Sequence, residues 1–496
     1  MYAIGIDIGT TSICGVVLDT ESGQVVKSRT EMSNAFIPRA NPWENSQDTD
    51  NIIALAQEIL ESFKEYPAAV IGVTGQMHGI VYVDAQGHAI SPLYTWQDAK
   101  GNLPYKDSTY AEYLGSFAGY GNVTDFYNRV NGVRPKEAAA YCTIMDYLVM
   151  VLCGLEKPRM HVTNAASLGC FDLKEKQFCS QADLSYDINA SVSDSYEIVG
   201  YYKGIPVSIA IGDNQASVFS TLAEERDLLI NVGTGSQVSV ISDSIRSGAN
   251  IETRPYFDGK YLVVGAALCG GRAYGMLKDF FGEFLTAAGI DGVDVYAVME
   301  RLAAGKEENS GQNDAQVTKQ ADGSGQGDMQ VARQADGSGQ GDMQVARQAD
   351  SSGQEATQLE KHADGALQVD TRFAGTRQNP EQCGSISGIN VNNFTAANLT
   401  YGFLEGMMEE LHQMYGQMTE EKCSLEALPK INLVGSGNGI RKNKILVQIA
   451  EKKFDGKLRI PAHTEEAAYG AALFGLVACG AFQSAGQAQA MIRYEV

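Results

Sequence analysis

The sequence reads IGIDIGTTSICGVVLD at residues 4–19 and LLINVGTGSQVSVISD at residues 228–243. Shifted by 224 positions, the Gly-Thr pair of the first stretch falls on that of the second, and both stretches end at an Asp. Each has an apolar strand, a polar Gly-Thr turn and a second apolar strand, which is the pattern of a β-hairpin. Two such hairpins at this separation predict two domains of related fold with a cleft between them.

Helices and strands are expected to alternate around these hairpins. Apolar residues recur at helical spacing from Asp48 to Phe63, and the buried strand Ala69–Thr74 is expected to follow. A further helix, with a methionine-rich apolar side typical of a core, is expected over Leu399–Tyr415. The pattern predicts an α/β protein with domains at residues 1–224 and 225–496.

Residues 306–361 break this pattern with four 14-residue units, two of which are the identical sequence QADGSGQGDMQVAR. Gly, Ser, Gln, Asp and Ala dominate these units, so they have few apolar residues with which to form a core. A solenoid remains an alternative because the period is regular. The composition favours a solvated surface insertion that takes no part in catalysis.

The composition is that of an ordinary globular protein, with 44% hydrophobic and 20% charged residues. The net charge of −22 and the lack of any basic block argue against nucleic acid or an anionic membrane as partner. The nine cysteines are scattered without a CxxC pair, which indicates reduced thiols in a cytoplasmic protein. No signal peptide is expected at the N-terminus and no membrane span elsewhere.

Each Gly-Thr turn has the composition of a phosphate-binding loop. Glycine lets the backbone approach a phosphate closely, and the following hydroxyl and N–H groups donate to its oxygens. Asp7 ends the first strand, where it can hold Mg²⁺, whereas Asn231 stands at that position in the second hairpin. The candidate phosphate-binding residues are Gly9, Thr10, Thr11 and Ser12 in the first turn and Gly233, Thr234, Gly235 and Ser236 in the second.

A third glycine-rich turn reads Gly-Ser-Gly-Asn-Gly at residues 435–439, after a predicted strand over Ile431–Val434. We expect a helix to begin after it, near Lys442. A strand-to-helix turn of this kind lets the backbone lie against a flat ring or a phosphate. It has neither the P-loop nor the GxGxxG spacing, so by itself it is a weak signal.

Polar and aromatic residues gather in two turns of the first half, Gly75–Gly79 and Thr95–Asp98. Gln, His and Asp can bond sugar hydroxyls, and an indole face can pack on the C–H surface of a sugar. A satisfied loop histidine and a core tryptophan are the alternatives, but turns after strands are where α/β sites are usually built. The candidate substrate-binding residues are Gln76, Met77, His78, Trp96 and Asp98.

Asp213 follows a predicted apolar strand over Val207–Ile211 and a glycine, just before the second hairpin. In phosphoryl transfer one carboxylate accepts the proton of the attacking hydroxyl. Asp213 is the candidate for that base. A helix N-cap is the structural alternative, and the two roles do not exclude each other.

Together these motifs resemble the FGGY family of carbohydrate kinases over nearly the whole chain outside residues 306–361. The resemblance implies two ribonuclease-H/actin-like domains, an N-terminal and a C-terminal FGGY domain, that close over ATP and a sugar. It implies Asp213 as catalytic base and sugar ligand, and Asp7 and Asp213 as Mg²⁺ ligands. It adds an adenosine-binding set of Gly435, Ser436, Gly437, Asn438 and Asn443.

Within the family, the Thr-Trp-Gln-Asp run at 95–98 is most similar to sedoheptulokinases. Asn214 after the candidate base instead resembles xylulokinases, so xylulose and other sugars or polyols stay open. The expected partners are therefore a small sugar and ATP, with a homodimer as one option for assembly. An actin- or Hsp70-like ATPase without a sugar, and a sugar sensor on an inactive kinase scaffold, are the rivals. The first has no need of the sugar segments, and the second should have lost Asp7 or Asp213.

Overall fold

The computed structural model describes residues 1–179, 190–224, 226–248, 250–305, 367–376, 379, 381–419 and 431–495. The repeats expected to form a surface insertion at 306–361 lie outside these residues. Two compact units are distinguished. The first holds both large sheets and comprises 1–276, 370–384 and 404–496, and the second comprises 277–369 and 385–403.

The first sheet has the strand order β15-β16-β5-β1-β2-β3, with β17 also pairing with β5. Strand β1 is antiparallel to β2 and parallel to β5, and β2 is antiparallel to β3. The hairpin predicted over residues 4–19 is therefore confirmed as β1 and β2. The strands are β1 Tyr2–Ile8, β2 Ser12–Asp19, β3 Val25–Met32, β5 Ala68–Gly75, β15 Ile198–Tyr202, β16 Ile205–Ser208 and β17 Ile211–Gly212.

The second sheet has the order β20-β21-β19-β18-β24-β25. Its strands are β18 Asp227–Val232, β19 Ser236–Ser242, β20 Ile251–Pro255, β21 Tyr261–Ala267, β24 Asn432–Ser436 and β25 Leu458–Arg459. In the first sheet the order β3-β2-β1-β5 consists of three antiparallel strands followed by one parallel strand. In the second sheet the order β21-β19-β18-β24 repeats this pattern. The repeated hairpin thus opens two sheets of the same local topology, as predicted.

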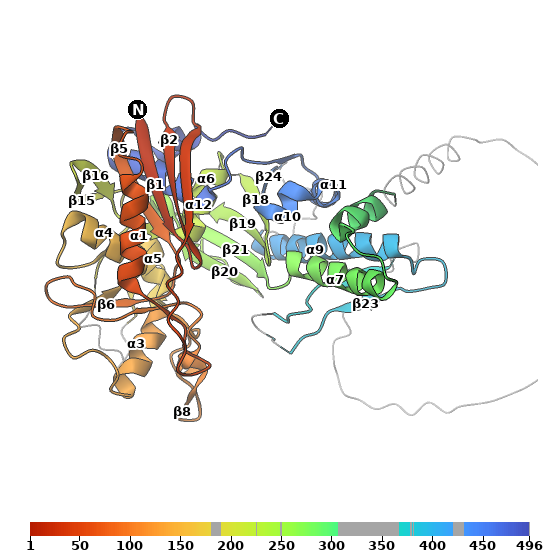
Figure 1. Cartoon of the computed structure of the whole chain (residues 1–496), viewed down its shortest axis with the longest axis horizontal. Coiled ribbons are helices and arrows are strands. Elements are labelled where there is room, and N and C mark those ends of the chain that lie inside the picture. Colours follow the sequence, from red (N-terminus) through yellow and green to blue (C-terminus); the bar gives the residue numbers. More distant parts are fainter. Residues whose placement is uncertain are drawn as a thin grey trace, which may run out of the picture. The chain divides into compact units, whose positions relative to one another are not determined.

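Helices α1 and α12 cover opposite faces of the first sheet. Helix α1, Thr49–Glu61, begins where predicted, with the Asp48 carboxylate accepting from the N–H of Asn51 at 3.0 Å, and it lies along the sheet in Figure 1. A side chain at Gly15 would meet Ile59 and Phe63 at the end of this helix, whereas one at Gly5 would meet α12, Glu466–Ala478. The apolar periodicity of residues 48–63 therefore predicted the buried face correctly.

The contact between α12 and the first sheet brings backbone against backbone. A Cβ atom built at Gly5 would lie 1.8 Å from the Ala468 oxygen, and one at Gly72 would lie 1.9 Å from the Ala471 oxygen. On the helix itself, Gly470 faces helix α6, Asp213–Thr221, where a Cβ would lie 1.9 Å from the Ala216 oxygen. Glycine is required at these points because any side chain would force the elements apart.

Other helices surround the sheets or lie in the second unit. The predicted helix at 399–415 is longer than expected, and its methionine-rich side is buried as predicted. None of the described helices is long and apolar enough to cross a membrane. The remaining main helices are α2 Tyr110–Tyr113, α3 Gly121–Val130, α4 Ile144–Cys153, α5 Val162–Ser167, α7 Gly271–Ala287, α9 Ala396–Met418, α10 Gly437–Lys442, α11 Lys444–Lys453 and α13 Ala485–Gln489.

Gly470→Ala is expected to destabilise the protein by about 1–3 kcal/mol, because the added methyl group overpacks the α6–α12 contact. Thermal unfolding followed by circular dichroism should show a lower Tm than wild type. Gly282→Ala in α7 is the matched control, since nothing lies within 4 Å of its Cβ position and alanine favours a helix. An unchanged Tm for Gly470→Ala would contradict the packing argument.

Candidate active site

The two candidate carboxylates lie at one edge of the first sheet. Asp7 is next to last in β1 and pairs in parallel register with Thr74 of β5. On the other side of β5, Ile211 of β17 pairs with the same Thr74, and Asp213 follows β17 directly. Neighbouring strands are about 4.8 Å apart. The predicted metal ligand and the predicted base therefore lie two strands apart, at the carboxyl ends of parallel strands.

Burial, together with the nearby carboxylates of Asp213 and Glu465, raises the pKa of Asp7 to about 7. Burial also raises the pKa of Asp213 to about 6, although the guanidinium of Arg254 opposes this shift. One oxygen of Asp7, Oδ1, is buried and has no hydrogen-bond partner among the described residues. The acidic groups at this edge would therefore be stabilised by a cation.

The donor set fits Mg²⁺ better than a metal held wholly by the protein. No group of three or more Asp, Glu, His or Cys side chains within the described part of the chain is placed to hold an ion. Mg²⁺ commonly takes one or two carboxylates and fills its other positions with water and substrate phosphates. Asp7 and Asp213 together meet that requirement.

A buried polar network supports the backbone before Asp213. The Asn164 amide donates to the Asp146 carboxylate at 2.9 Å and to the Ala210 carbonyl at 3.1 Å. The Gly212 N–H donates to the Thr163 hydroxyl at 3.1 Å. Burial raises the pKa of Asp146 to about 7. These bonds fix the point where the chain leaves the sheet and α6 begins.

Two local predictions around Asp213 are wrong. The strand expected at Val207–Ile211 is divided into β16 and β17, because the Ile209 N–H donates instead to the Glu197 carbonyl and Ala210 is held by Asn164. The helix N-cap is Gly212 and not Asp213, which is the first residue of α6. Asp213 therefore lies in the first turn of α6 and is not its N-cap residue.

The first predicted sugar segment is held tightly at the end of β5. The His78 backbone has the left-handed φ of 74°, its ring Nδ1 lies 2.7 Å from the Ser167 carbonyl oxygen, and its ring stacks on Tyr120 at 4.2 Å. Met77 is buried, and the Gln76 amide donates to Gln47 at 2.8 Å. The Gln76 Oε1 is buried and accepts no hydrogen bond from the residues that the structure describes. It is therefore available as an acceptor.

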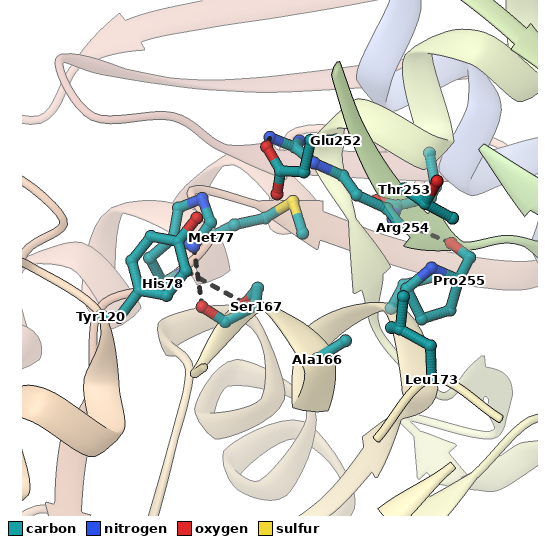
Figure 2. Close-up of a pocket in the computed structure, with 12 residues that line it drawn as sticks. Met77, His78, Tyr120, Ala166, Ser167, Leu173, Glu252, Thr253, Arg254 and Pro255 are labelled. Carbon is teal, nitrogen blue, oxygen red and sulfur yellow. Dashed lines mark hydrogen bonds and ion pairs between the residues drawn. The ribbon is translucent and has the colours of Figure 1, made fainter. Parts of the chain in front are cut away.

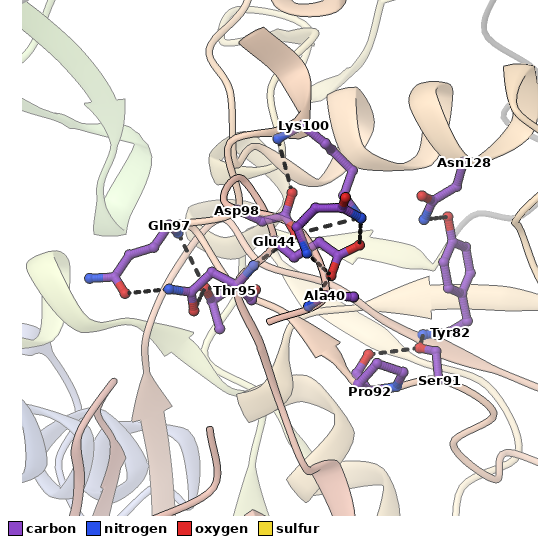
Figure 3. A network of polar contacts seen from close by, with 12 residues as sticks. Ala40, Glu44, Tyr82, Ser91, Pro92, Thr95, Gln97, Asp98, Lys100 and Asn128 are labelled. Atoms are coloured by element: carbon purple, nitrogen blue, oxygen red, sulfur yellow. Dashed lines mark hydrogen bonds and ion pairs between the residues drawn. The ribbon is translucent and has the colours of Figure 1, made fainter. Parts of the chain in front are cut away.

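Trp96 and Asp98 of the second predicted sugar segment lie in different environments. Trp96 is 45% exposed, which rules out the alternative of a core tryptophan, and its indole N–H donates to the Thr10 hydroxyl at 3.0 Å. Asp98 is only 1% exposed. Its carboxylate accepts from the backbone N–H groups of Asn45 and Lys100 and lies 3.5 Å from the Lys100 ammonium, as Figure 3 shows. Trp96 thus adjoins the phosphate turn, whereas Asp98 is saturated by protein groups and its predicted role in sugar binding stays a prediction.

A pocket of about 310 Å³, counting space open to solvent, adjoins these residues (Figure 2). Met77 and His78 line it, so the structure brings part of the predicted sugar segment to a cavity. The opposite wall comes from strand β20 of the second sheet. The other lining residues are Tyr120, Thr163, Ala166, Ser167, Leu173, Gln215, Glu252, Thr253, Arg254 and Pro255.

Sequence reasoning did not assign a role to Tyr120, Glu252 or Arg254. The only local signal is the spacing of Glu252 and Arg254, two residues apart, which places both on one face of a strand. That spacing does not indicate which residues the face with Glu252 and Arg254 contacts.

The two phosphate turns keep tight backbone geometry. In the first, the Gln47 amide donates to the Thr10 carbonyl at 2.6 Å. In the second, the Gly233 N–H donates to the Gly235 carbonyl at 2.9 Å, and Gly271 at the start of α7 donates to the Gly233 carbonyl at 3.0 Å. The second Gly-Thr turn therefore contacts the N-terminal end of helix α7.

The third glycine-rich turn lies beside the second hairpin, because β18 and β24 are neighbours. The Asn231 amide donates to the Ser436 hydroxyl at 2.7 Å, and that hydroxyl donates to Glu466 at 2.7 Å. Gly437 has a left-handed φ of 81°, and a Cβ there would lie 2.5 Å from the Val232 oxygen. The predicted second phosphate segment and the residues 435–438 are thus brought together.

The helix predicted near Lys442 begins earlier. Helix α10 starts at Gly437, inside the glycine-rich turn, and ends at Lys442. A second helix, α11, follows at Lys444 with Asn443 as its N-cap, whose side-chain oxygen accepts from the N–H of Leu446 at 3.0 Å. The Asn443 oxygen is therefore engaged locally, and its predicted contact with adenosine stays a prediction.

The class of protein expected from the sequence, a carbohydrate kinase, is confirmed by family similarity. The chain matches the N-terminal domain of the FGGY family of carbohydrate kinases at residues 2–103 and the C-terminal domain of that family at residues 228–479. The chain belongs to this family and is a sugar kinase.

Individual relatives agree with this assignment. The sedoheptulokinase of Mus musculus is 26% identical over 95% of this chain and 96% of its own. The xylulose kinase structure from Rhodospirillum rubrum has a TM-score of 0.74 at 17% identity, covering all of this chain and 93% of its own. The structure of a Plasmodium falciparum glycerol kinase with ADP has a TM-score of 0.70 at 15% identity, covering 100% of this chain and 93% of its own. The expected two-domain actin-like fold is confirmed.

Asp98→Asn is expected to destabilise the protein by about 3–5 kcal/mol, because it leaves the Lys100 ammonium buried without its counter-charge. Thermal unfolding should show a large fall in Tm, which the double variant Asp98→Asn/Lys100→Met partly recovers. Asp194→Asn, which breaks the exposed pair with Lys176, is the control and should change Tm little. A stable Asp98→Asn protein that has lost its sugar affinity would instead support a direct contact with sugar.

Proposed function

We propose that this kinase transfers the terminal phosphate of ATP to a terminal hydroxyl of a ketose, and that the ketose is sedoheptulose, giving sedoheptulose 7-phosphate. The geometry that carries the reaction is the position of Asp213 at the sheet edge shared with Asp7, two residues before Gln215, which lines the pocket. The full-length similarity to a sedoheptulokinase supports the sugar. The ADP-bound glycerol kinase of similar fold supports ATP as the donor.

In the proposed mechanism Asp213 is the general base. With a pKa of about 6 it is ionised at neutral pH, so it can accept the hydroxyl proton as the sugar oxygen attacks the γ-phosphorus. The bond from that phosphorus to the β-phosphate bridging oxygen breaks, and ADP leaves. The nearby guanidinium of Arg254 favours the charged form of the base.

We further propose that the backbone N–H groups of the two Gly-Thr turns hold the phosphates and that the turn at 435–438 holds adenosine. Asp7 and Asp213 would hold Mg²⁺, directly or through water. When bound, Mg²⁺ supplies neutralisation of the phosphate charge. The indole N–H of Trp96 on Thr10 orients the first turn beside the sugar segment.

Xylulose is the second candidate substrate. Asn214 follows the proposed base, as in xylulokinases, and the similar solved structures include a xylulose kinase. The two ketoses have the same functional groups and differ in chain length, so the chemistry proposed above applies to either.

Asp213→Asn is expected to lower kcat by about 10²-fold or more, because the amide keeps the size of the side chain but cannot accept the proton. In wild type, kcat/KM for the sugar should fall as pH drops below about 6, where Asp213 becomes protonated. This acid limb should be absent from the residual activity of the variant. Coupled measurement of ADP release across pH checks both statements, and near wild-type turnover would remove the base role.

A substrate panel distinguishes the candidate sugars. We expect kcat/KM to be highest for sedoheptulose when ADP release with Mg·ATP is measured over sedoheptulose, xylulose, ribulose, glycerol and gluconate. A rate with xylulose that equals or exceeds the rate with sedoheptulose would overturn the substrate assignment and leave the kinase assignment standing. Omitting the sugar is the control, and rapid hydrolysis of ATP without any acceptor would contradict phosphoryl transfer to sugar.

A further inference from the structure

Strand β20 places an ion pair in the wall of the pocket. Glu252 and Arg254 lie two residues apart on this strand, and the Arg254 Nη2 lies 2.8 Å from the Glu252 Oε2. The Arg254 side chain is 14% exposed and that of Glu252 is 34% exposed. Figure 2 shows the Arg254 side chain extending from β20 to Glu252, close to Met77 in this view. Glu252 and Arg254 line the same pocket as Met77 and His78, so the pair faces the same space as the predicted sugar segment.

Arg254 has donor capacity that the protein does not use. Its Nε is buried and donates to no acceptor in the described ranges. A buried N–H without an acceptor is costly, so such groups usually meet a ligand or water. Since this N–H lies on a residue that lines the pocket, a ligand in the pocket is the natural source of the acceptor.

The pair presents a donor and an acceptor side by side. A guanidinium only donates hydrogen bonds, and an ionised carboxylate only accepts them. A hydroxyl does both, so two hydroxyls on neighbouring carbons can bond the pair at once, one donating to Glu252 and the next accepting from Arg254. The positive charge of Arg254 is already balanced by Glu252 and faces the nearby Asp213, so the site fits a neutral sugar better than a sugar acid.

We propose that Glu252 and Arg254 clamp two vicinal hydroxyls of the acceptor sugar and determine which sugar is phosphorylated. This inference rests on the proposed function only in requiring a sugar with vicinal hydroxyls in the pocket. It makes the second sheet, and not only the predicted segments of the first half, a contributor to sugar specificity.

The clamp is held at a fixed spacing from the proposed base. Gln215, two residues after Asp213 on α6, donates from its side-chain amide to the Pro255 carbonyl at 3.0 Å. Pro255 follows Arg254 directly at the end of β20. The helix that carries the base and the strand that carries the clamp are thus joined by one buried hydrogen bond, so a sugar held by the clamp has a defined position relative to Asp213.

The clamp can be tested with three variants, Arg254→Met, Arg254→Lys and Glu252→Gln. Each is assayed with the best acceptor sugar of the wild-type enzyme. Loss of a charge-assisted hydrogen bond should raise KM for the sugar about ten- to a hundredfold in Arg254→Met. KM for ATP should stay within about twofold of wild type. Arg254→Lys should recover part of the sugar affinity because it keeps one donor. Arg159→Met, at an exposed pair with Glu197 outside the pocket, is the matched control and should leave both KM values unchanged.

Monodeoxy analogues of that sugar separate contact from structural damage. Wild type should lose affinity for the analogue that lacks a clamped hydroxyl, whereas Arg254→Met should bind this analogue as well as the parent sugar. This measurement on wild type also keeps the test decisive if Arg254→Met fails to fold. Equal KM values for wild type and the Arg254 and Glu252 variants, or no wild-type preference between parent and any vicinal deoxy sugar, would overturn the clamp.

The substrate assignment and the clamp are tested by different measurements. The ranking of sugars by wild type tests the substrate assignment, while the ratio of variant to wild-type KM tests the clamp on whichever sugar ranks first. A preference for gluconate that Arg254→Met abolishes would show a carboxylate-binding arginine and would also overturn the diol clamp.

Discussion

The site depends on the parallel pairing of β5 with β1 on one side and with β17 on the other. Thr74 in β5 is the common neighbour, and its hydroxyl donates to the Ile211 carbonyl at 2.7 Å. This register brings two acidic side chains to one sheet edge, where burial and mutual repulsion raise the pKa of Asp7. Such a concentration of charge is unfavourable for the isolated protein. Binding of the proposed Mg²⁺ ion and ATP phosphates at this edge would offset that cost.

The second sheet provides a positive charge near this edge. Arg254 on β20 opposes the upward shift of the pKa of Asp213, and Gln215 joins β20 to the helix of the base. The same arginine borders the pocket beside Met77. If Arg254 binds the sugar as proposed, one residue from the second half of the chain connects the state of the proposed base with sugar recognition, and neither half alone would form a complete site.

The parts of the fold that follow from local patterns were predictable. The hairpins are encoded by apolar strands around Gly-Thr turns, and α1 is encoded by its apolar spacing and the Asp48 cap. Non-local contacts were not predictable. Asp98 was grouped with Trp96 because the two are neighbours in sequence, yet Lys100 and Asn45 saturate its carboxylate. The spacing of Arg254 and Glu252 placed them on one strand face but did not show that Arg254 shares a pocket with Met77 and His78, which lie more than 170 positions earlier in the sequence.

Helix α12 has a consequence for how the protein is made. Its residues 466–478 cover a face of the sheet that contains β1, residues 2–8, so a large part of the first core is completed by a segment more than 450 positions later. While the chain is being synthesised, that sheet face stays uncovered until residues 466–478 have left the ribosome. Contacts of such long sequence separation slow folding and prolong the exposure of apolar surface. The first half of this kinase is thus first in the chain and among the last parts to finish folding.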